Sequence, residues 1–361
     1  MRYLFFTNTP AHVHLYKHAA ERLAADGDDV LLLARDYGCT VDLLEYYDLP
    51  HVVYGRCETT KGSLLRELPR HYLRLAIETR RFDPDMIFGI GAYAAHASAL
   101  VRAPCVLIHD SEPTGLDHAI SRPFARAILT PRAFRKELGA KHYEFSGFKE
   151  SAYLHPAVFE ADESVREELG VGREKRYAIV RFNAFGSHHD VGHEGFTPEQ
   201  RRTLVDSLDE DVTVFVSDEG GTMNYEGVNA RPFDLHPARL HDALSEASLL
   251  VADTQTIATE AALLGTPTIR SNSFVGDDDM GNFRALAEAG LIANVREFDA
   301  VLELAGELLA DDSTEDRWRR RRREYVESMV NLTDVIVEVA RTQARLEEVA
   351  GVSPRGAGQA V

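Results

Sequence analysis

The sequence predicts an α/β protein made of two tandem doubly wound, Rossmann-like domains, followed by helices that return to the first domain. Short, almost continuously apolar runs alternate with longer amphipathic runs along most of the 361 residues. This alternation is typical of buried parallel strands joined by crossover helices. The rhythm breaks near residues 146–160, and the chain is long enough for two α/β domains of ordinary size.

The first series of strands begins almost at the N-terminus and defines a domain over residues 1–150. Helices are expected between the strands, for example at 14–25 and 64–81. The segment Ser146–Glu150 interrupts the series and is interpreted as the start of an inter-domain connection. The expected strands are 3–6, 30–33, 52–54, 86–90, 106–108 and 127–129.

A second series of strands defines a domain over residues 160–312. Residues 313–348 are expected to be helical, and the last helix, from about residue 332, is expected to cross back onto the first domain. The Gly/Ala-rich segment 349–361 is predicted to be a disordered tail. The expected strands of the second domain are 177–182, 212–216, 249–252 and 268–269.

Six arginines gather between residues 317 and 323 on one of the C-terminal helices. Acidic residues flank them on both sides, at Glu315, Asp316, Glu324 and Glu327. Such mixed charge on a helix is typical of a solvated or ion-paired face. We therefore favour that interpretation over a nucleic-acid patch.

The overall charge also speaks against nucleic acid as a partner. The chain has 40 basic and 58 acidic residues, a net charge of −18, and only six of its basic residues are lysine. Broad nucleic-acid binding needs a basic face. Strong acidity with scarce lysine instead suggests a halophilic protein whose carboxylate-rich surface stays solvated in concentrated salt.

The cysteine pattern and the hydropathy predict a cytoplasmic protein. Cys39, Cys57 and Cys105 are scattered without metal-ligand spacing, which favours a reduced compartment. No signal-peptide pattern is present, and no apolar run approaches the roughly 18–20 residues of a transmembrane helix. Peripheral membrane contact and the oligomeric state are left open.

Residues 249–270 carry the most informative pattern of the chain. A buried strand, 249–252, runs through a polar turn into a short helix, and Glu260 lies one turn inside that helix. The first N–H groups of such a helix have no partner within it and form an anion site, to which Thr254, Gln255 and Thr256 can add donors. Glu260 could accept hydrogen bonds from a ribose diol. The pattern thus suggests a nucleotide diphosphate, with an ordinary capped helix and a solvated Glu260 as the alternative.

The loop after the first strand of the second domain is a second candidate for anion contact. Arg181, Asn183, Ser187 and His188 are its expected donors. Adjacent histidines usually point apart, and no second ligand cluster supports zinc, so no metal is predicted. The potential metal ligands of this loop are His188, His189, Asp190 and His193.

Two loops of the first domain carry candidate acid–base groups. His12 follows the first strand, and His109, Asp110 and Glu112 follow the strand at 106–108. Ligands of doubly wound domains bind beyond the carboxyl ends of the strands, where a base would be useful. The alternatives are a surface histidine in a capped helix for His12, and a helix cap before Pro113 for the second group.

Taken in order, these segments resemble the GT-B glycosyltransferases. His12 falls at the histidine in the first loop of the lipid-linked UDP-N-acetylglucosamine transferases of peptidoglycan synthesis, although Pro10 and Ala11 replace that loop's glycines. The segment 84–93, followed by 106–110, resembles the same enzymes' proline–aspartate strand, glycine–tyrosine turn and histidine–glutamate strand end. The segment 258–268 resembles their donor motif, in which a glutamate binds the uridine ribose, and Glu260 takes that position.

The whole chain resembles still more an uncharacterised archaeal family related to GT-B transferases and to UDP-N-acetylglucosamine 2-epimerases. The segments that carry this resemblance are Arg35-Asp36-Tyr37-Gly38, residues 187–192 and residues 253–256. The resemblance covers roughly residues 1–345. It implies an N-terminal acceptor-side domain and a C-terminal nucleotide-sugar donor domain.

The expected function is transfer of a sugar from a nucleotide-diphosphate sugar, with UDP as the expected nucleotide, to a glycan or lipid-linked acceptor. Arg181 and the helix after Thr254 would stabilise the leaving diphosphate with no cofactor required, and Glu260 would hold the ribose. His12, Asp110 or Glu112 would deprotonate the acceptor. Cell-surface glycan biosynthesis would be the setting. Two alternatives remain open: a UDP-N-acetylglucosamine 2-epimerase-like enzyme and a non-catalytic GT-B-like scaffold.

Overall fold

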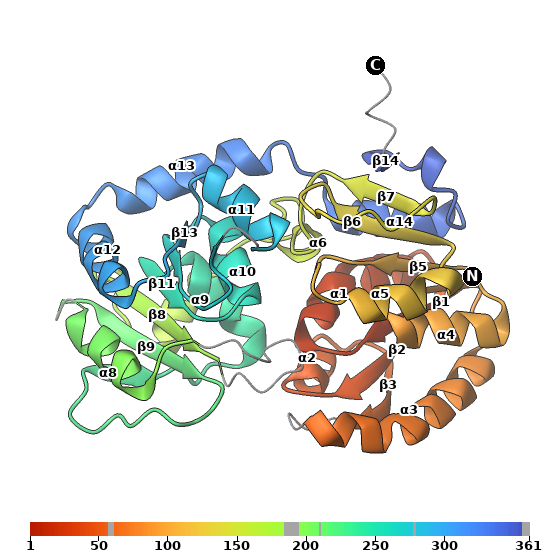
Figure 1. Ribbon diagram of the computed structural model, residues 1–361, viewed down its shortest axis with the longest axis horizontal. Coiled ribbons are helices and arrows are strands. Elements are labelled where there is room, and N and C mark those ends of the chain that lie inside the picture. Colours follow the sequence, from red (N-terminus) through yellow and green to blue (C-terminus); the bar gives the residue numbers. More distant parts are fainter. Residues whose placement is uncertain (57–60, 184–194, 209–210, 277–278, 356–361) are drawn as a thin grey trace. The chain divides into compact units, whose positions relative to one another are not determined.

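The chain folds into two units, each with its own sheet of mainly parallel strands (Figure 1). The computed structural model describes residues 1–56, 61–183, 195–208, 211–276 and 279–355. Unit 1 comprises Met1–Phe159 and Ser328–Val361, and unit 2 comprises Glu160–Glu327.

Unit 1 holds an eight-stranded sheet of order β14-β7-β6-β5-β4-β1-β2-β3. All neighbouring strands are parallel except β14 and β7. The strands are β1 (Arg2–Thr7), β2 (Asp29–Asp36), β3 (His51–Arg56), β4 (Met86–Gly89), β5 (Cys105–Ile108), β6 (Ala127–Pro131), β7 (His142–Phe145) and β14 (Val352–Pro354). The helices are α1 (Pro10–Ala25), α2 (Thr40–Tyr46), α3 (Lys61–Phe82), α4 (Ala92–Val101), α5 (Gly115–Ser121), η1 (Arg122–Phe124), α6 (Ser151–Leu154), α14 (Leu332–Arg341) and η4 (Leu346–Glu348).

Unit 2 holds a six-stranded parallel sheet of order β10-β9-β8-β11-β12-β13. The strands are β8 (Tyr177–Phe182), β9 (Thr213–Asp218), β10 (Ala230–Pro232), β11 (Leu249–Ala252), β12 (Thr268–Arg270) and β13 (Ala293–Asn294). The helices are α7 (Val165–Glu168), α8 (Pro198–Ser207), η3 (Pro237–Arg239), α9 (Leu240–Ser245), α10 (Thr256–Leu264), α11 (Gly281–Glu288), α12 (Phe298–Ala310) and α13 (Thr314–Val326).

The central strands are apolar on both faces because helices cover both sides of each sheet. In unit 1, Leu4, Phe6 and Leu107 are completely buried, and in unit 2 the same holds for Val180 and Val251. These continuous apolar runs are the signal by which the sequence predicted parallel strands. The predicted fold class is therefore confirmed for each unit.

One turn of unit 1 depends on glycine. Gly91 precedes α4 with a φ of +82°, which favours glycine, and a Cβ there would come within 2.3 Å of Asp117 Oδ2. The close approach lets the carboxylate of Asp117, on α5, accept the N–H of Ala92 at 3.0 Å. This contact satisfies one of the free donors at the start of α4.

The C-terminal helices divide between the two units. Trp318 on α13 donates from Nε1 to the carbonyl of Leu291 at 3.1 Å, within unit 2. Helix α14 packs instead on α1 and α6 of unit 1, where Thr333 Oγ1 donates to the carbonyl of Ala152 at 2.7 Å. The change of unit thus falls after α13, at Ser328.

The predicted disordered tail from residue 349 is wrong for its first part, because residues 352–354 form β14. This strand pairs antiparallel with β7, with Val352 opposite Phe145. An edge strand of a sheet exposes unpaired backbone groups, and β14 supplies partners for those of β7. A short strand of this kind lacks the apolar run on which the sequence prediction relied.

The arginine-rich helix α13 bears out the prediction of an ion-paired face. Arg317 and Arg319 form ion pairs with Asp311 and Glu315, while Arg322 donates to the carbonyl of Leu263 at 2.9 Å. None of the helices in the described ranges is both long and apolar enough to cross a membrane.

Candidate functional site

In unit 2, Asp253 joins the loops that follow the carboxyl ends of three strands. It lies directly after β11, and its carboxylate accepts the backbone N–H of Asn183 at 2.7 Å and of Phe196 at 3.2 Å. Its own carbonyl accepts the side-chain amide of Asn272 at 3.0 Å, after β12. Burial raises the pKa of Asp253 to about 7, although the two backbone donors act in the opposite direction. The ends of β8, β11 and β12 are therefore fixed together.

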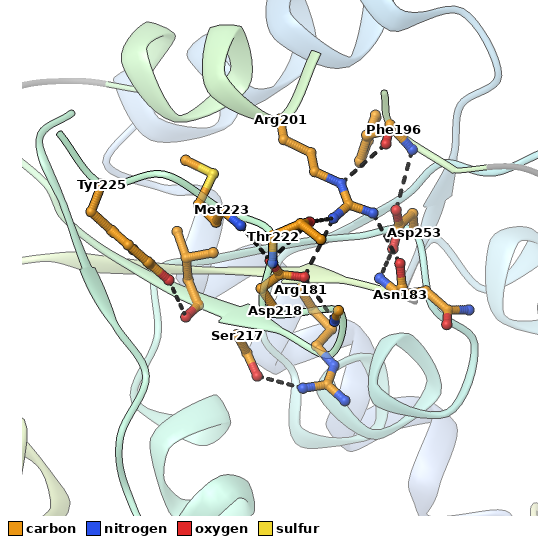
Figure 2. A network of polar contacts seen from close by, with 12 residues as sticks. Arg181, Asn183, Phe196, Arg201, Ser217, Asp218, Thr222, Met223, Tyr225 and Asp253 are labelled. Carbon is orange, nitrogen blue, oxygen red and sulfur yellow. Dashed lines mark hydrogen bonds and ion pairs between the residues drawn. The ribbon is translucent and has the colours of Figure 1, made fainter. Parts of the chain in front are cut away.

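A second residue, Arg201 on α8, extends this network, as Figure 2 shows. Its guanidinium donates to the carbonyls of Asn183 at 2.9 Å and Phe196 at 3.1 Å. The same group lies 3.3 Å from Asp218 Oδ1 and 3.2 Å from Thr222 Oγ1. Arg201 thus links the end of β8 to the end of β9.

Asp218 shapes the turn that follows β9. Its carboxylate accepts the backbone N–H groups of Gly220 at 3.0 Å, Thr222 at 2.6 Å and Met223 at 2.7 Å. Three donors on one carboxylate hold the turn in one conformation. The loops at the carboxyl edge of the unit 2 sheet are consequently preorganised by two carboxylates with little solvent exposure, Asp253 and Asp218, and by Arg201 (Figure 2).

Helix α10 begins at this edge with an open N-terminus. Its N-cap residue is Gln255, whose side chain makes no capping hydrogen bond. Thr254 is buried, and its Oγ1 has no hydrogen-bond partner among the described residues. The first N–H groups of an uncapped helix carry partial positive charge and attract anions. The hydroxyl of Thr254 is available beside them, while Thr256 is exposed.

Glu260 lies one turn further along α10 and is buried, so the alternative of a solvated Glu260 is wrong. His241 on α9 faces it, with its Nε2 3.1 Å from Glu260 Oε1, and both side chains are almost inaccessible to solvent. A buried carboxylate needs such a partner. The sequence indicated the unusual glutamate but gave no sign of its histidine neighbour.

Arg181, at the end of β8, is already engaged within unit 2. Its guanidinium donates to Ser217 and forms an ion pair with Glu219. The other predicted donors of this loop, Ser187 and His188, lie outside the described residues, as do His189, Asp190 and His193. Across the described ranges, no group of three or more histidine, cysteine or acidic residues is placed to hold a metal ion.

In unit 1, Asp110 pairs with a lysine that the sequence analysis assigned to a connection. Lys149 Nζ lies 2.5 Å from Asp110 Oδ2 and 3.7 Å from Glu150 Oε1. Burial opposes ionisation of Asp110, but the charge and hydrogen bond of Lys149 outweigh it and lower the pKa of the carboxyl. Asp110 is therefore an ionised carboxylate held by a buried ammonium group.

His12 lies close enough to this ion pair to be influenced by both charges. Burial first, and then the positive charge of Lys149, lower the pKa of His12 to about 3, although Asp110 acts in the opposite direction. Its Nδ1 accepts the backbone N–H of Asn8 at 3.2 Å. A neutral imidazole that accepts at Nδ1 carries its proton on Nε2. His12 is thus set up as a hydrogen-bond donor through Nε2.

The other two candidates of unit 1 have different surroundings. His109 is buried with its ring 4.6 Å from that of His118, and burial lowers its pKa to about 3. Glu112 accepts the backbone N–H of Arg135 at 3.1 Å through Oε1, which fastens the turn after β6. The structure therefore brings together His12, Asp110 and Lys149. His109 packs against His118 instead, and Glu112 binds the backbone of Arg135.

Solved structures with the same fold include enzymes of two kinds. The UDP-GlcNAc 2-epimerase from Neisseria meningitidis, solved bound to UDP-GlcNAc, has a TM-score of 0.66 and 12% identity, covering 95% of this chain and 100% of that chain. The calicheamicin glycosyltransferase CalG4 has a TM-score of 0.60 and 14% identity over 97% and 99%. MurG from Acinetobacter baumannii has a TM-score of 0.56 and 16% identity over 94% and 99%. At these identities the likeness shows the fold, which is the GT-B fold.

A protein of Methanocaldococcus jannaschii described as uncharacterised is 25% identical over 280 residues, which cover 73% of this chain and 79% of that protein. Residues 3–345 match the family described as "Protein of unknown function (DUF354)". This match spans both units. The chain therefore belongs to the DUF354 family.

Proposed function

We propose that the protein transfers a sugar from a nucleotide-diphosphate sugar, with UDP-sugars the first donors to test, to a hydroxyl group of a glycan or lipid-linked acceptor. The observation that carries the proposal is the preorganised carboxyl edge of unit 2. There the uncapped N-terminus of α10 and the unpartnered hydroxyl of Thr254 lie one turn before the buried carboxylate of Glu260. The helix N-terminus and the hydroxyl can donate to a diphosphate, and the carboxylate can accept from the ribose of the same nucleotide.

The reaction would break the bond between the anomeric carbon and the diphosphate oxygen. The acceptor oxygen would form a new bond to that carbon and lose its proton, and the diphosphate would leave with additional negative charge. The N-terminus of α10 and Thr254 would stabilise that charge. Among the groups of unit 1, the ionised Asp110 would receive the proton on Oδ1, because Lys149 occupies Oδ2. His12 would donate a hydrogen bond from Nε2.

We expect the Thr254→Val variant to lose donor affinity about 10- to 100-fold, because a hydroxyl bonded to a charged phosphate contributes roughly 1.5–3 kcal/mol. Its free energy of unfolding should stay unchanged or rise, since the replaced hydroxyl has no hydrogen-bond partner among the described residues. Isothermal titration calorimetry with UDP, UDP-GlcNAc and GDP- and dTDP-sugars measures the affinity. Thr79→Val, which removes another buried unpartnered hydroxyl in unit 1, is the matched control. Equal affinities in all three proteins, or no binding of any nucleotide by the parent, would refute the proposed donor site.

The roles of Asp110 and His12 can be separated by conservative variants. Release of UDP from UDP-GlcNAc, with water or an added acceptor extract as the acceptor, gives the rate. Asp110→Asn should lower the rate about 100-fold or more, as expected for loss of a general base. His12→Gln keeps an N–H donor and should stay within about tenfold of the parent, whereas His12→Ala should not. An active Asp110→Asn together with an inactive His12→Gln would make His12 the base.

A second candidate function is epimerisation at C2 of a UDP-sugar, favoured by the two carboxylates, Asp110 and Glu150, around Lys149. Removal of the C2 proton requires a carboxylate or a similar base close to that carbon. Incubation of UDP-GlcNAc with the protein in deuterium oxide distinguishes the reactions. Epimerisation places deuterium on C2, whereas transfer leaves that carbon untouched.

A further inference from the structure

Large apolar side chains are exposed together on one group of helices in unit 1. Leu116 on α5 is 78% exposed and Leu73 on α3 is 63% exposed. Most of the other well-exposed large apolar residues of the described chain lie on α3 and α5 or on α4 and η1, which pack against them. The exposed apolar residues on these four helices are Leu73 and Ile77 on α3, Leu100 on α4, Leu116 and Ile120 on α5, and Phe124 on η1.

These helices form one continuous layer. Helix α4 packs against α3 on one side and against α5 and η1 on the other, and the three long segments lie together in Figure 1. The hydroxyl of Tyr72 on α3 lies 2.8 Å from Nδ1 of His96 on α4. The ring of His96 is 5.2 Å from that of Phe124. The exposed apolar residues therefore belong to one surface, the α3–α5 face.

On α3, apolar and basic residues share the solvent side. His71, Leu75 and Thr79 are buried and lie along one side of the helix, at spacings of four residues. Leu73 and Ile77, also four residues apart, lie on the opposite side. The arginines at 66, 70, 74, 80 and 81 are all exposed around them.

The charge of this face is opposite to that of the chain. Over residues 66–82, 92–102 and 115–124 there are seven arginines and three carboxylates. Two of the carboxylates are already engaged, since Glu67 pairs with Arg70 and Asp117 caps α4. The chain as a whole has a net charge of −18. A basic face with exposed apolar residues on a strongly acidic protein indicates a specific anionic partner rather than general solubility.

We propose that the α3–α5 face docks on the surface of an anionic lipid bilayer. The arginines would contact the lipid head groups, and Leu73, Ile77 and Leu116 would enter the boundary between head groups and acyl chains. Interfacial helices bind in this manner, through apolar area and basic residues together. The apolar residues lie among the arginines on neighbouring helices. This arrangement matches a bilayer, whose anionic head groups cover apolar acyl chains. Vesicle binding needs no sugar donor, so the inference stands independently of the proposed sugar transfer.

Sedimentation with vesicles tests the proposal on the full chain. The parent protein should bind vesicles containing about one third phosphatidylglycerol and should not bind pure phosphatidylcholine vesicles. Binding should weaken as KCl rises from about 0.1 M to about 1 M. The Leu73→Ser/Ile77→Ser variant and the Arg70→Gln/Arg74→Gln variant should each bind the anionic vesicles at least about tenfold more weakly.

Matched controls lie outside the face. Tyr46→Ser removes a comparably exposed apolar residue on α2, and Arg319→Gln/Arg323→Gln removes two arginines from α13 of unit 2; both should bind like the parent. Circular dichroism melting checks that each variant is folded. The chain has one tryptophan, the buried Trp318. A Leu116→Trp variant places a second indole on the α3–α5 face, and brominated acyl chains of anionic vesicles should quench the fluorescence of that indole.

Three outcomes would overturn the inference: no binding to anionic vesicles by the parent, equal binding by the face variants and controls, or absence of quenching at position 116. A concentration-dependent dimer that the Leu73→Ser/Ile77→Ser variant abolishes, without vesicle binding, would assign the face to a second copy of the chain instead.

Discussion

Replacing Arg201 by Met should destabilise unit 2 by about 3 kcal/mol or more, the scale at which removal of one partner breaks a buried ion pair. Arg201 and Asp218 are nearly buried, with side chains 11% and 4% exposed. Without the guanidinium, the carbonyls of Asn183 and Phe196 lose their donor, and the contact between Arg201 and the Phe182 ring, 4.9 Å to its centroid, disappears. Urea unfolding measures the loss.

The neighbouring residue on α8 provides a matched control. Arg202 pairs with Asp206 at 3.7 Å, and both side chains are about half exposed, so Arg202→Met should change the free energy of unfolding by about 0.5 kcal/mol or less. Hydrogen exchange should show that the effect of Arg201→Met is centred on the amides of Asn183 and Phe196, which Asp253 accepts. Similar destabilisation by both variants would mean that the network adds nothing beyond ordinary surface charge.

The sequence predicted the central strands of both sheets because those strands are buried on both faces and leave a continuous apolar signal. The missed strands are short or polar strands at the sheet edges or next to them. In β7, for example, His142 and Glu144 interrupt the apolar pattern, and β10 contains Pro232. Their pairing depends on neighbours far away in the chain, as with β7 and β14. Local periodicity carries no information about such partners.

The missed strand also explains the missed site residue. Because β7 was not predicted, residues 146–150 were interpreted as a connection instead of the loop after a strand. With β7 in place, Lys149 follows the carboxyl end of a strand in the same parallel sheet as β5, after which Asp110 lies. A buried lysine near a sheet edge deserves the same scrutiny as a histidine or a carboxylate there. Only six lysines occur in the chain, which makes each position more informative.

In the candidate donor site, some residues are indicated by the local sequence and others only by the folded unit. Thr254 and Glu260 were indicated by local order alone, because a strand and a polar turn place Thr254 just before the helix and Glu260 one turn inside it. His241, Arg201 and Asp218 come from other elements of unit 2, and their contacts exist only in the folded unit. Local order therefore indicates the candidate contact residues, whereas the residues that position their loops become evident only in the folded unit.

Acidification from about pH 7.5 to about pH 5 should destabilise unit 1 while leaving unit 2 as stable as before, or more so. In unit 1, burial lowers the pKa of His109 to about 3 and that of His142 to about 4. Between those values and the ordinary pKa of 6.5, the unfolded chain binds more protons than the folded unit. The stability of unit 1 therefore decreases as the pH is lowered. At about pH 5, each histidine should cost about 2 kcal/mol, from 1.36 kcal/mol per pH unit.

The contribution of Asp253 to the pH dependence of stability has the opposite sign. Burial raises its pKa from 3.8 to about 7, so between these values the folded unit holds the proton more tightly than the unfolded chain, and stability rises as pH falls. Between about pH 7 and about pH 5 the gain should be about 3 kcal/mol. Differential scanning calorimetry at constant salt should therefore show one transition that falls in temperature on acidification and one that does not.

Two variants assign those transitions. His109→Leu keeps the volume of the side chain and removes a ring whose Nε2 has no hydrogen-bond partner in the described structure, so at about pH 5 the falling transition should recover by roughly 2 kcal/mol. Asp253→Asn should abolish the acid stabilisation of the other transition, because the amide does not titrate. Two transitions that fall together, unchanged by either variant, would mean that neither the neutral histidines nor the protonated Asp253 governs the response, since the two mechanisms require opposite signs in separate units.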